Sequence, residues 1–478
     1  MSDGVRPGLR RRSPVHGLAR RQLGQLEVLA QSVSGAAPSA AMAATPAIVA
    51  ASAGGGTVWS FVIATALALL IAACIARFTR RMAAPGGLYS LTAKGLTPAA
   101  AYASALGLVV GYGLLAAGTL AGVTLYVDAL VDHLTGSGLG AIGRGVVAAL
   151  VGGLVGVLVL RGARLSARVV LLVESISIGL MLVVFTLLLA TAPTVPAPAA
   201  PAAPAGVVAG VLPALTAFIG FEIATSLGAE ARRPFRSVPR AVGYTAAVAG
   251  ILYVFAAHVQ VVGFSATPGG LAGQSEPVVA LAARDGWGWI PVALDVGLAM
   301  SFLACTLAAT TALVRVLFSL SRDRVAPRAL GRTHPVHRTP HVAVAVAVPV
   351  VTAVPVVPLV AAVPSATVLM VVLTLATCGF LLAYVLVCAA APVFLRRIGE
   401  LTWPAVAVSV VLVPILLAVL VVFVAGSPWS AYVLVGLLLA GVAGYLTLRV
   451  RRPAALATIG VYDETTADDV LTDRPGSP

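Results

Sequence analysis

The sequence predicts an all-α integral membrane protein with 12 transmembrane helices. Of the 478 residues, 59% are hydrophobic and only 10% are charged, whereas a soluble domain of this length needs far more polar surface. Long apolar runs recur along the chain, and the positive charges fall in short clusters between them. The net charge of +14 would suggest a nucleic-acid partner in a soluble protein. Clustered loop arginines are typical of a membrane surface instead, so we expect a lipid bilayer and no nucleic acid.

The apolar runs give the positions of the spans, because a transmembrane helix needs about 20 apolar residues. Twelve segments meet this requirement, at about 26–51, 57–76, 99–127, 145–160, 167–192, 206–229, 241–263, 289–318, 341–361, 366–391, 404–424 and 430–449. The transmembrane domain is therefore expected at residues 23–450. Helices 1–5 occupy about 26–192, helices 6–10 about 206–391 and helices 11–12 about 404–449.

The positions of Lys and Arg orient these spans. With a cytoplasmic N-terminus, 28 of the 31 basic residues fall in cytoplasmic segments, and only Arg144 and Arg284 fall in external loops. This asymmetry favours a multi-pass protein of the cell membrane with both termini in the cytoplasm. Residues 1–22 then form a basic cytosolic tail. Residues 451–478 are acidic and lack apolar periodicity, so we expect a disordered cytosolic tail there.

Two spans contain residues that interrupt a helix. Helix 1 has Pro38 among small residues, and proline removes a backbone donor and clashes with the preceding turn. Helix 6 has Gly220 followed by Glu222. Spans 1 and 6 are corresponding members of two five-helix halves, whose topology is inverted because five is odd. Matched interruptions indicate a transporter site, since half-helix ends offer N–H groups to a carboxylate and carbonyl groups to an ammonium. Each interruption alone is explained equally well as a kink.

Four stretches carry a resemblance to a known family. They are Pro85-Gly86-Gly87-Leu88-Tyr89; Gly162-Ala163-Arg164-Leu165-Ser166-Ala167; Ala217-Phe218-Ile219-Gly220-Phe221-Glu222 with Glu230, Pro234 and Val238-Pro239-Arg240; and Arg315 with Ser321-Arg322-Asp323-Arg324-Val325-Ala326-Pro327 and Thr339-Pro340. In this order they resemble the amino acid–polyamine–organocation (APC) transporter superfamily and its amino acid permeases, over about residues 23–450. The resemblance implies a leucine-transporter-type fold: a five-plus-five inverted repeat with helices 1 and 6 broken, plus two extra helices. It also implies alternating access, with the substrate between helices 1, 3, 6, 8 and 10.

The resemblance further implies a set of substrate positions. The Gly-Ser-Gly of the family's helix 1 falls on Pro38-Ser39-Ala40. Ser39 keeps a hydroxyl, but Pro38 has no backbone N–H to donate. The candidate substrate-binding residues are Ser34, Gly35, Ala36, Ala37, Ser39, Ala40, Thr216, Phe218, Ile219, Gly220 and Phe221.

The candidate coupling and gating residues are Glu222, Thr310, Thr311 and Tyr112. A carboxylate in a membrane is costly unless it is protonated or partnered, so Glu222 is either a proton-coupling group or a structural acceptor in the broken helix. The two threonines either join helix 1 carbonyls around sodium, or pack between helices or bond back to carbonyls. A proton couple or uncoupled exchange is favoured over sodium. Tyr112 either lines the pocket or packs in the core.

We expect no cofactor, no metal site and no enzyme. The four cysteines lie inside apolar runs and lack a metal-ligand spacing. His334, His337 and His341 lie in a basic loop where the family pattern already has a histidine. The sequence also lacks G-x-S-x-G and H-E-x-x-H motifs.

The predicted function is secondary active transport of an amino acid or a related small amine. The small residues around the two interruptions leave room for a bulky or apolar side chain. Glu222 is the only acidic residue in the two broken segments, and a strongly cationic solute would have to use it, so a neutral amino acid or small amine is favoured. A transport-inactive sensor or accessory protein with the same fold is the alternative, since a fold does not guarantee a function. The sequence leaves open whether the protein is a monomer or a homodimer.

Overall fold

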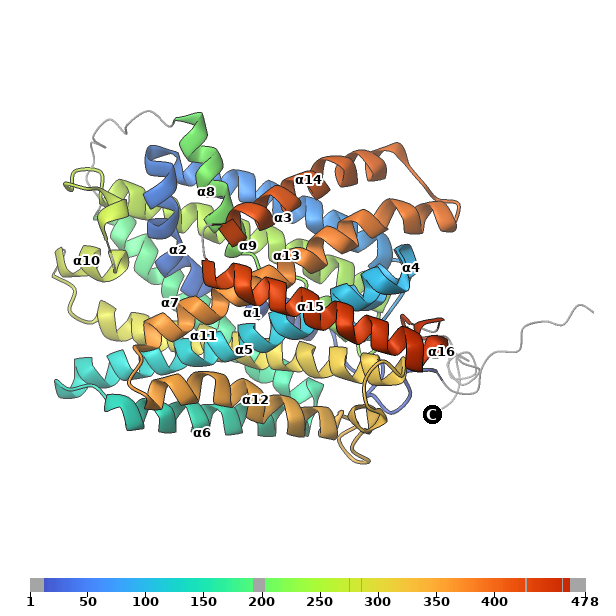
Figure 1. Ribbon diagram of the computed structural model, residues 1–478. Helices are drawn as coiled ribbons and strands as arrows, with labels where there is room; N and C mark the ends of the chain where they lie inside the picture. Colours follow the sequence, from blue (N-terminus) through green and yellow to red (C-terminus); the bar gives the residue numbers. More distant parts are fainter. Residues whose placement is uncertain are drawn as a thin grey trace, which may run out of the picture.

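The computed structural model describes residues 13–191, 203–274, 276–284, 286–425, 428–457 and 459–464. Long helices lie side by side in a bundle (Figure 1). The α-helices are α1 Gln25–Gly35, α2 Pro38–Ala53, α3 Thr57–Thr79, α4 Leu88–Gly95, α5 Pro98–Thr135, α6 Gly140–Arg161, α7 Ala163–Ala190, α8 Pro204–Thr216, α9 Pro234–Gly263, α10 Pro277–Arg284, α11 Ile290–Arg322, α12 His341–Val360, α13 Ser365–Arg397, α14 Trp403–Ala425, α15 Pro428–Arg451 and α16 Pro453–Ala457. The short 3₁₀ helices are η1 Gly54–Gly56, η2 Ile223–Leu227, η3 Leu271–Gly273 and η4 Arg328–Gly331.

The helices agree with the predicted all-α membrane class. Nine helical segments in the described ranges are long and apolar enough to cross a membrane, and the first of them, Gln25–Thr79, contains α1, α2 and α3. Helix α8 is a shorter apolar helix. Every predicted span overlaps one helix or a broken pair. The count of twelve spans and their inverted repeat stay predictions.

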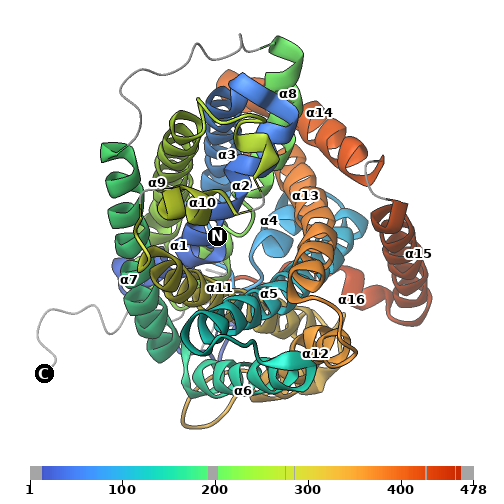
Figure 2. The ribbon, with the colours of Figure 1, turned by 90° about the vertical axis from the view of Figure 1, so that its left-hand side faces the viewer.

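The bundle has two ends that differ in content. Helix α10 lies at one end, and α4 and α16 lie at the other (Figure 1). We refer to them as the α10 end and the α4 end. Viewed along the bundle, α6 and α12 form a pair at one edge, while α14 and α15 lie at another (Figure 2).

Helix α5 packs against both α11 and α13. Its crossing with α13 is close because two glycines meet there. A Cβ on Gly107 would lie 2.7 Å from the carbonyl oxygen of Gly379, and a Cβ on Gly379 would lie 2.4 Å from that of Gly107. Small residues allow such approach between apolar helices, which have little hydrophobic drive to associate in lipid. The core is therefore built on backbone proximity as well as on large side chains.

The C-terminal residues differ from the expected disordered tail. Residues 453–457 form α16, and residues 459–464, which we call the C-terminal strap, lie against the α4 end. The backbone N–H of Asp463 donates to the carbonyl of Ala83 at 2.7 Å. Composition predicts disorder because the strap lacks apolar periodicity. Backbone hydrogen bonds nevertheless hold it, together with the Asp463 carboxylate, which accepts from Ser13 at 2.7 Å and pairs with Arg20 at 2.8 Å. Residues 465–478 lie outside the described part of the chain.

Candidate functional site

The first interruption lies between α1 and α2 and occupies two residues. Ala36 and Ala37 separate the helices, and Ala37 adopts a left-handed backbone with φ 43°. Pro38 explains this break, because its ring disfavours a helical conformation in the preceding residue. At the first position of α2 the missing N–H of Pro38 costs little. The residue that departs from the family pattern therefore also starts the second half-helix.

The second interruption follows α8. The helix ends at Thr216, residues 217–222 form turns, and η2 begins at Ile223. Gly220 has φ +98°, a conformation that residues with a Cβ rarely adopt. The second break therefore contains more non-helical residues than the first one does.

The two breaks touch each other directly. A Cβ on Gly35 would lie 2.2 Å from the carbonyl oxygen of Gly220, and a Cβ on Gly220 would lie 2.1 Å from that of Gly35. Tyr253 of α9 joins the breaks, since its hydroxyl donates to the carbonyls of Ala217 at 3.0 Å and Ala36 at 3.3 Å. The matched interruptions predicted from the sequence thus form one structural unit. Tyr253 was not predicted, because no sequence signal links α9 to the breaks.

The Ser39 side chain is hydrogen-bonded to α7. The hydroxyl of Ser177 donates to Ser39 Oγ at 2.7 Å, and it also lies 2.6 Å from the carbonyl oxygen of Gly297. The carbonyl of Gly35 accepts from the thiol of Cys305 at 3.3 Å. Both sides of the first break therefore have contacts with neighbouring helices.

Glu222 lies at the end of the second break and is fully buried. The hydroxyl of Tyr112 donates to Glu222 Oε1 at 2.9 Å, and the hydroxyl of Tyr384 donates to Oε2. The backbone N–H of Gly220 also donates to the Tyr384 hydroxyl at 3.4 Å. The carboxyl group thus joins α5 and α13 to the broken helix. Tyr384 was missed, since nothing in the apolar run of α13 distinguishes it from a packing tyrosine.

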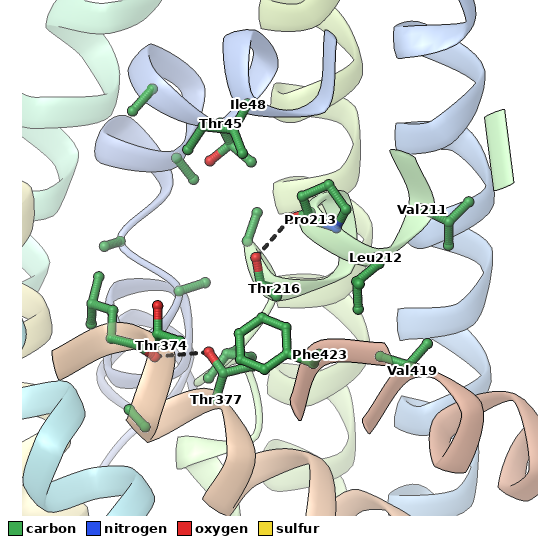
Figure 3. A pocket seen from close by; sticks show the side chains of 18 of the residues that line it. Thr45, Ile48, Val211, Leu212, Pro213, Thr216, Thr374, Thr377, Val419 and Phe423 are labelled. Atoms are coloured by element: carbon green, nitrogen blue, oxygen red, sulfur yellow. Dashed lines mark hydrogen bonds between the residues drawn. The ribbon is translucent and has the colours of Figure 1, made fainter. Parts of the chain in front are cut away.

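A cavity of about 1100 Å³ lies against the two breaks (Figure 3). Six predicted residues line it: Gly35, Ala36, Ala37, Ala40, Thr216 and Ile219. The remaining lining comes from α2, α3, α5, α8, α11, α13 and α14, and the cavity extends along α2 and α8 towards the α10 end. No lining side chain is charged, and the polar ones are mostly threonines, among them Thr45, Thr374 and Thr377 (Figure 3).

The other predicted site residues do not line this cavity. Phe218 packs edge-on against Tyr253, with ring centroids 5.0 Å apart, and Phe221 packs on Tyr384 at 5.8 Å. Ser34 lies beside the buried carboxylate of Glu174. The residues that are buried away from the cavity are Ser34, Ser39, Phe218, Gly220, Phe221, Glu222, Tyr112, Thr310 and Thr311.

The two threonines of α11 have partners in the protein. The hydroxyl of Thr310 donates to the carbonyl of Thr306 at 2.7 Å, which is back-bonding within one helix. Thr311 Oγ1 lies 3.5 Å from Ser166 Oγ. Thr310 thus bonds back to its own helix and Thr311 contacts α7, and the roles of the two threonines stay predictions.

The α4 end of the bundle contains a buried ion pair. Arg315 of α11 donates to Glu230 Oε2 from Nε at 2.8 Å and from Nη2 at 2.6 Å. Both side chains are buried, with exposed fractions of 3% and 2%. Nη1 of the same arginine donates to the carbonyl of Thr311 at 2.8 Å. Such a pair is specific, because either partner alone would be an uncompensated buried charge.

The C-terminal strap closes over the same end. Tyr89 of α4 donates to Asp323 Oδ2 at 2.6 Å, and the backbone N–H groups of Gly460 and Val461 donate to the same carboxylate at 2.8 and 3.2 Å. Burial raises the pKa of the Asp323 carboxyl, while the hydrogen bond from Tyr89 lowers it. A small apolar cluster joins the strap to this end, through Val461 of the strap; the other members are Val15, Leu18, Ala229 and Phe318.

The proteins of known family or name that this chain resembles are permeases and transporters. A family model described as amino acid permease matches residues 23–441. The chain is 26% identical to the branched-chain amino acid permease BcaP of Bacillus subtilis and 25% identical to the methylthioribose transporter of that organism, over 62% of this chain and 66% of each relative. It is 30% identical to an uncharacterized transporter of Mycobacterium tuberculosis, over 68% of this chain and 72% of the relative. All three names describe transport proteins.

Proposed function

Because the chain belongs to the amino acid permease family, we propose that it is a secondary active transporter that moves a neutral amino acid or small amine by alternating access. That it is a multi-pass membrane transporter follows from the family and the apolar helices. The observation that carries the finer proposal is the cavity placed directly against the two touching breaks. Half-helix ends in a membrane are rare except where backbone lines a binding cavity.

The cavity chemistry supports a solute with an apolar part. Its lining carries no charge, so a charged side chain on the substrate would lose its hydration without gaining a partner. The ammonium of the substrate is assigned to backbone carbonyls at the breaks, and its carboxylate to the N-terminal end of α2. The relative named for branched-chain amino acids agrees with an apolar side chain.

We further propose a topology of twelve spans in the cell membrane, arranged as a five-plus-five repeat with two extra helices. The α4 end faces the cytoplasm in this arrangement, which puts 28 of the 31 basic residues on that side. The cavity then extends towards the external side, while the Arg315–Glu230 pair and the strap lie on the closed cytoplasmic side. This is the expected geometry of an outward-facing state.

Counterflow into liposomes tests the transport proposal. Purified protein preloaded with an unlabelled solute should exchange it saturably for a radiolabelled neutral amino acid, and not for a strongly cationic amine. Ala40→Leu should reduce exchange of large apolar amino acids at least about tenfold while sparing alanine, because the added atoms fill the cavity. Ala149→Leu, on an exposed face of α6, is the matched control. Absence of any exchange by folded parent protein would favour the sensor alternative.

The coupling role of Glu222 needs a separate measurement. We propose that this carboxyl group takes up and releases the coupled proton, because it is a fully buried carboxyl group at the second break and its two tyrosine partners connect it to α5 and α13. Glu222→Gln keeps the shape and removes the charge, so it should abolish uphill uptake driven by a pH gradient while counterflow persists. Tyr112→Phe is the comparison variant, since it removes one hydrogen bond and leaves the carboxyl group. Equal loss of counterflow and uphill uptake would assign Glu222 a structural role.

A further inference from the structure

A second pocket, separate from the cavity at the breaks, lies at the α4 end. Its volume is about 800 Å³, and four arginines line it together with Pro327 and residues 453–455. Arg324 and Arg328 come from the segment that follows α11, while Arg451 and Arg452 come from the end of α15. Two segments distant in sequence therefore direct four positive charges at one hollow.

These charges have no acidic partner within the described ranges. All four arginines are exposed, and the ion pairs at this end involve other arginines, such as Arg81 with Glu400 and Arg315 with Glu230. Four guanidinium groups around one hollow repel one another unless an anion lies between them. The planar guanidinium suits a phosphate best, because it donates two parallel hydrogen bonds to two oxygens.

The position of the pocket favours a lipid headgroup over a free phosphate ion as its ligand. Helix α15 is apolar and exposes large side chains to its last turn, with Leu446 50% and Val450 81% exposed. Arg451 and Arg452 follow at once. Since the exposed apolar face of a membrane helix is covered by acyl chains, the arginines at its end lie at the level of lipid headgroups. We propose that this pocket binds the phosphate-bearing headgroup of an anionic phospholipid.

A bound headgroup would also support the C-terminal strap. Arg452 directly precedes α16, and the strap then reaches Asp323 through the N–H groups of Gly460 and Val461. Arg324, on the other wall of the pocket, is the next residue after Asp323. A phosphate between the two walls therefore holds the end of α15 to the segment that anchors the strap. The pocket couples lipid composition to the order of the strap.

Native mass spectrometry of the delipidated full chain tests this site. The probes are short-chain phosphatidylglycerol, phosphatidylcholine with the same chains, and inorganic phosphate. The pocket variant replaces all four arginines by Gln, at Arg324, Arg328, Arg451 and Arg452. The control variant replaces four other exposed arginines near the start of α9, namely Arg232, Arg233, Arg236 and Arg240, which do not line this pocket. Both variants lose the same charge.

We expect the parent protein to bind one phosphatidylglycerol at least about tenfold more tightly than phosphatidylcholine, because each arginine near the surface contributes about fivefold. The pocket variant should lose this preference and the control variant should keep it. Equal loss in both variants would overturn the proposal in favour of general surface charge. Inorganic phosphate displacing the lipid at similar concentration would show a site for free anions. Binding that develops only after deletion of residues 465–478 would identify the acidic tail as the occupant.

Discussion

The lining of the cavity at the breaks and the α4 end of the bundle are built from opposite chemistry. The cavity that extends towards the α10 end has no charged lining, whereas the α4 end contains a buried ion pair, a buried carboxylate and the hydrogen-bonded strap. Apolar walls can accept solutes of several shapes at low cost, because dispersion contacts are not directional. Hydrogen bonds and ion pairs require defined geometry. In the proposed alternating access, opening of the α4 end therefore has to break contacts of defined geometry.

The contact between the two breaks lies at the boundary of these regions. Gly35 and Gly220 approach so closely that neither position has room for a side chain. In the proposed alternating access, opening of the α4 end moves the half-helices past this contact or turns them about it. We therefore expect substitutions at the glycine contact to have the largest effects on the folded protein. Substitutions in the buried ion pair of the α4 end should have smaller effects, and substitutions at the strap the smallest.

Gly220→Ala should have the largest effect. The new Cβ would lie 2.1 Å from the carbonyl oxygen of Gly35, and the φ of +98° would be strained. We expect a destabilisation above about 4 kcal/mol, at the extreme of single substitutions, with loss of folded protein in size-exclusion chromatography. Gly153→Ala in α6 is the control, because a Cβ added there would meet nothing from neighbouring helices within 4 Å. Normal folding of Gly220→Ala would show that the breaks can separate.

Glu230→Gln should have the next largest effect. It leaves Arg315 as a buried charge without its partner, at a cost of about 3–5 kcal/mol. The melting temperature should fall, and a cysteine label near the α4 end should become more accessible as this end opens. Glu400→Gln breaks an exposed pair with Arg81 and should cost about 1 kcal/mol or less. Equal effects of the two variants would show that the buried pair of Glu230 stabilises the protein no more than the exposed pair of Glu400 does.

The sequence predicts the class of the fold and the place of the breaks well. Hydropathy sets both the helices and their approximate ends, because the bilayer imposes a length on them. Pro38 and Gly220 predict the interruptions because each has a backbone property that other residues lack. These are local effects, and a local pattern is sufficient to find them.

The contents of the site could be predicted only in part. Of the predicted substrate residues, Ala36 and Thr216 line the cavity, whereas Ser39 bonds to Ser177 of α7. Which face of a half-helix meets the cavity depends on its rotation against neighbouring helices, and apolar helices carry little pattern that fixes it. Tyr253 and Tyr384 were missed for the same reason. The strap was missed because its contacts, such as those of Asp463 with Ala83 and Ser13, join segments that lie far apart in the sequence.

The smallest effect is expected for Tyr89→Phe, which weakens only the anchor of the strap. The variant removes one hydrogen bond to the Asp323 carboxylate and leaves those from Gly460 and Val461. A hydrogen bond to a charged group contributes about 1.5–3 kcal/mol, so hydrogen–deuterium exchange at residues 460 and 461 should accelerate at least about tenfold. The bulk melting temperature should change little, because the strap is peripheral to the core. Tyr244→Phe, on an exposed face of α9, should leave the exchange unchanged. Unaltered exchange in Tyr89→Phe would mean that the apolar cluster around Phe318 holds the strap, and the closure of the α4 end would then depend less on polar contacts than its geometry indicates.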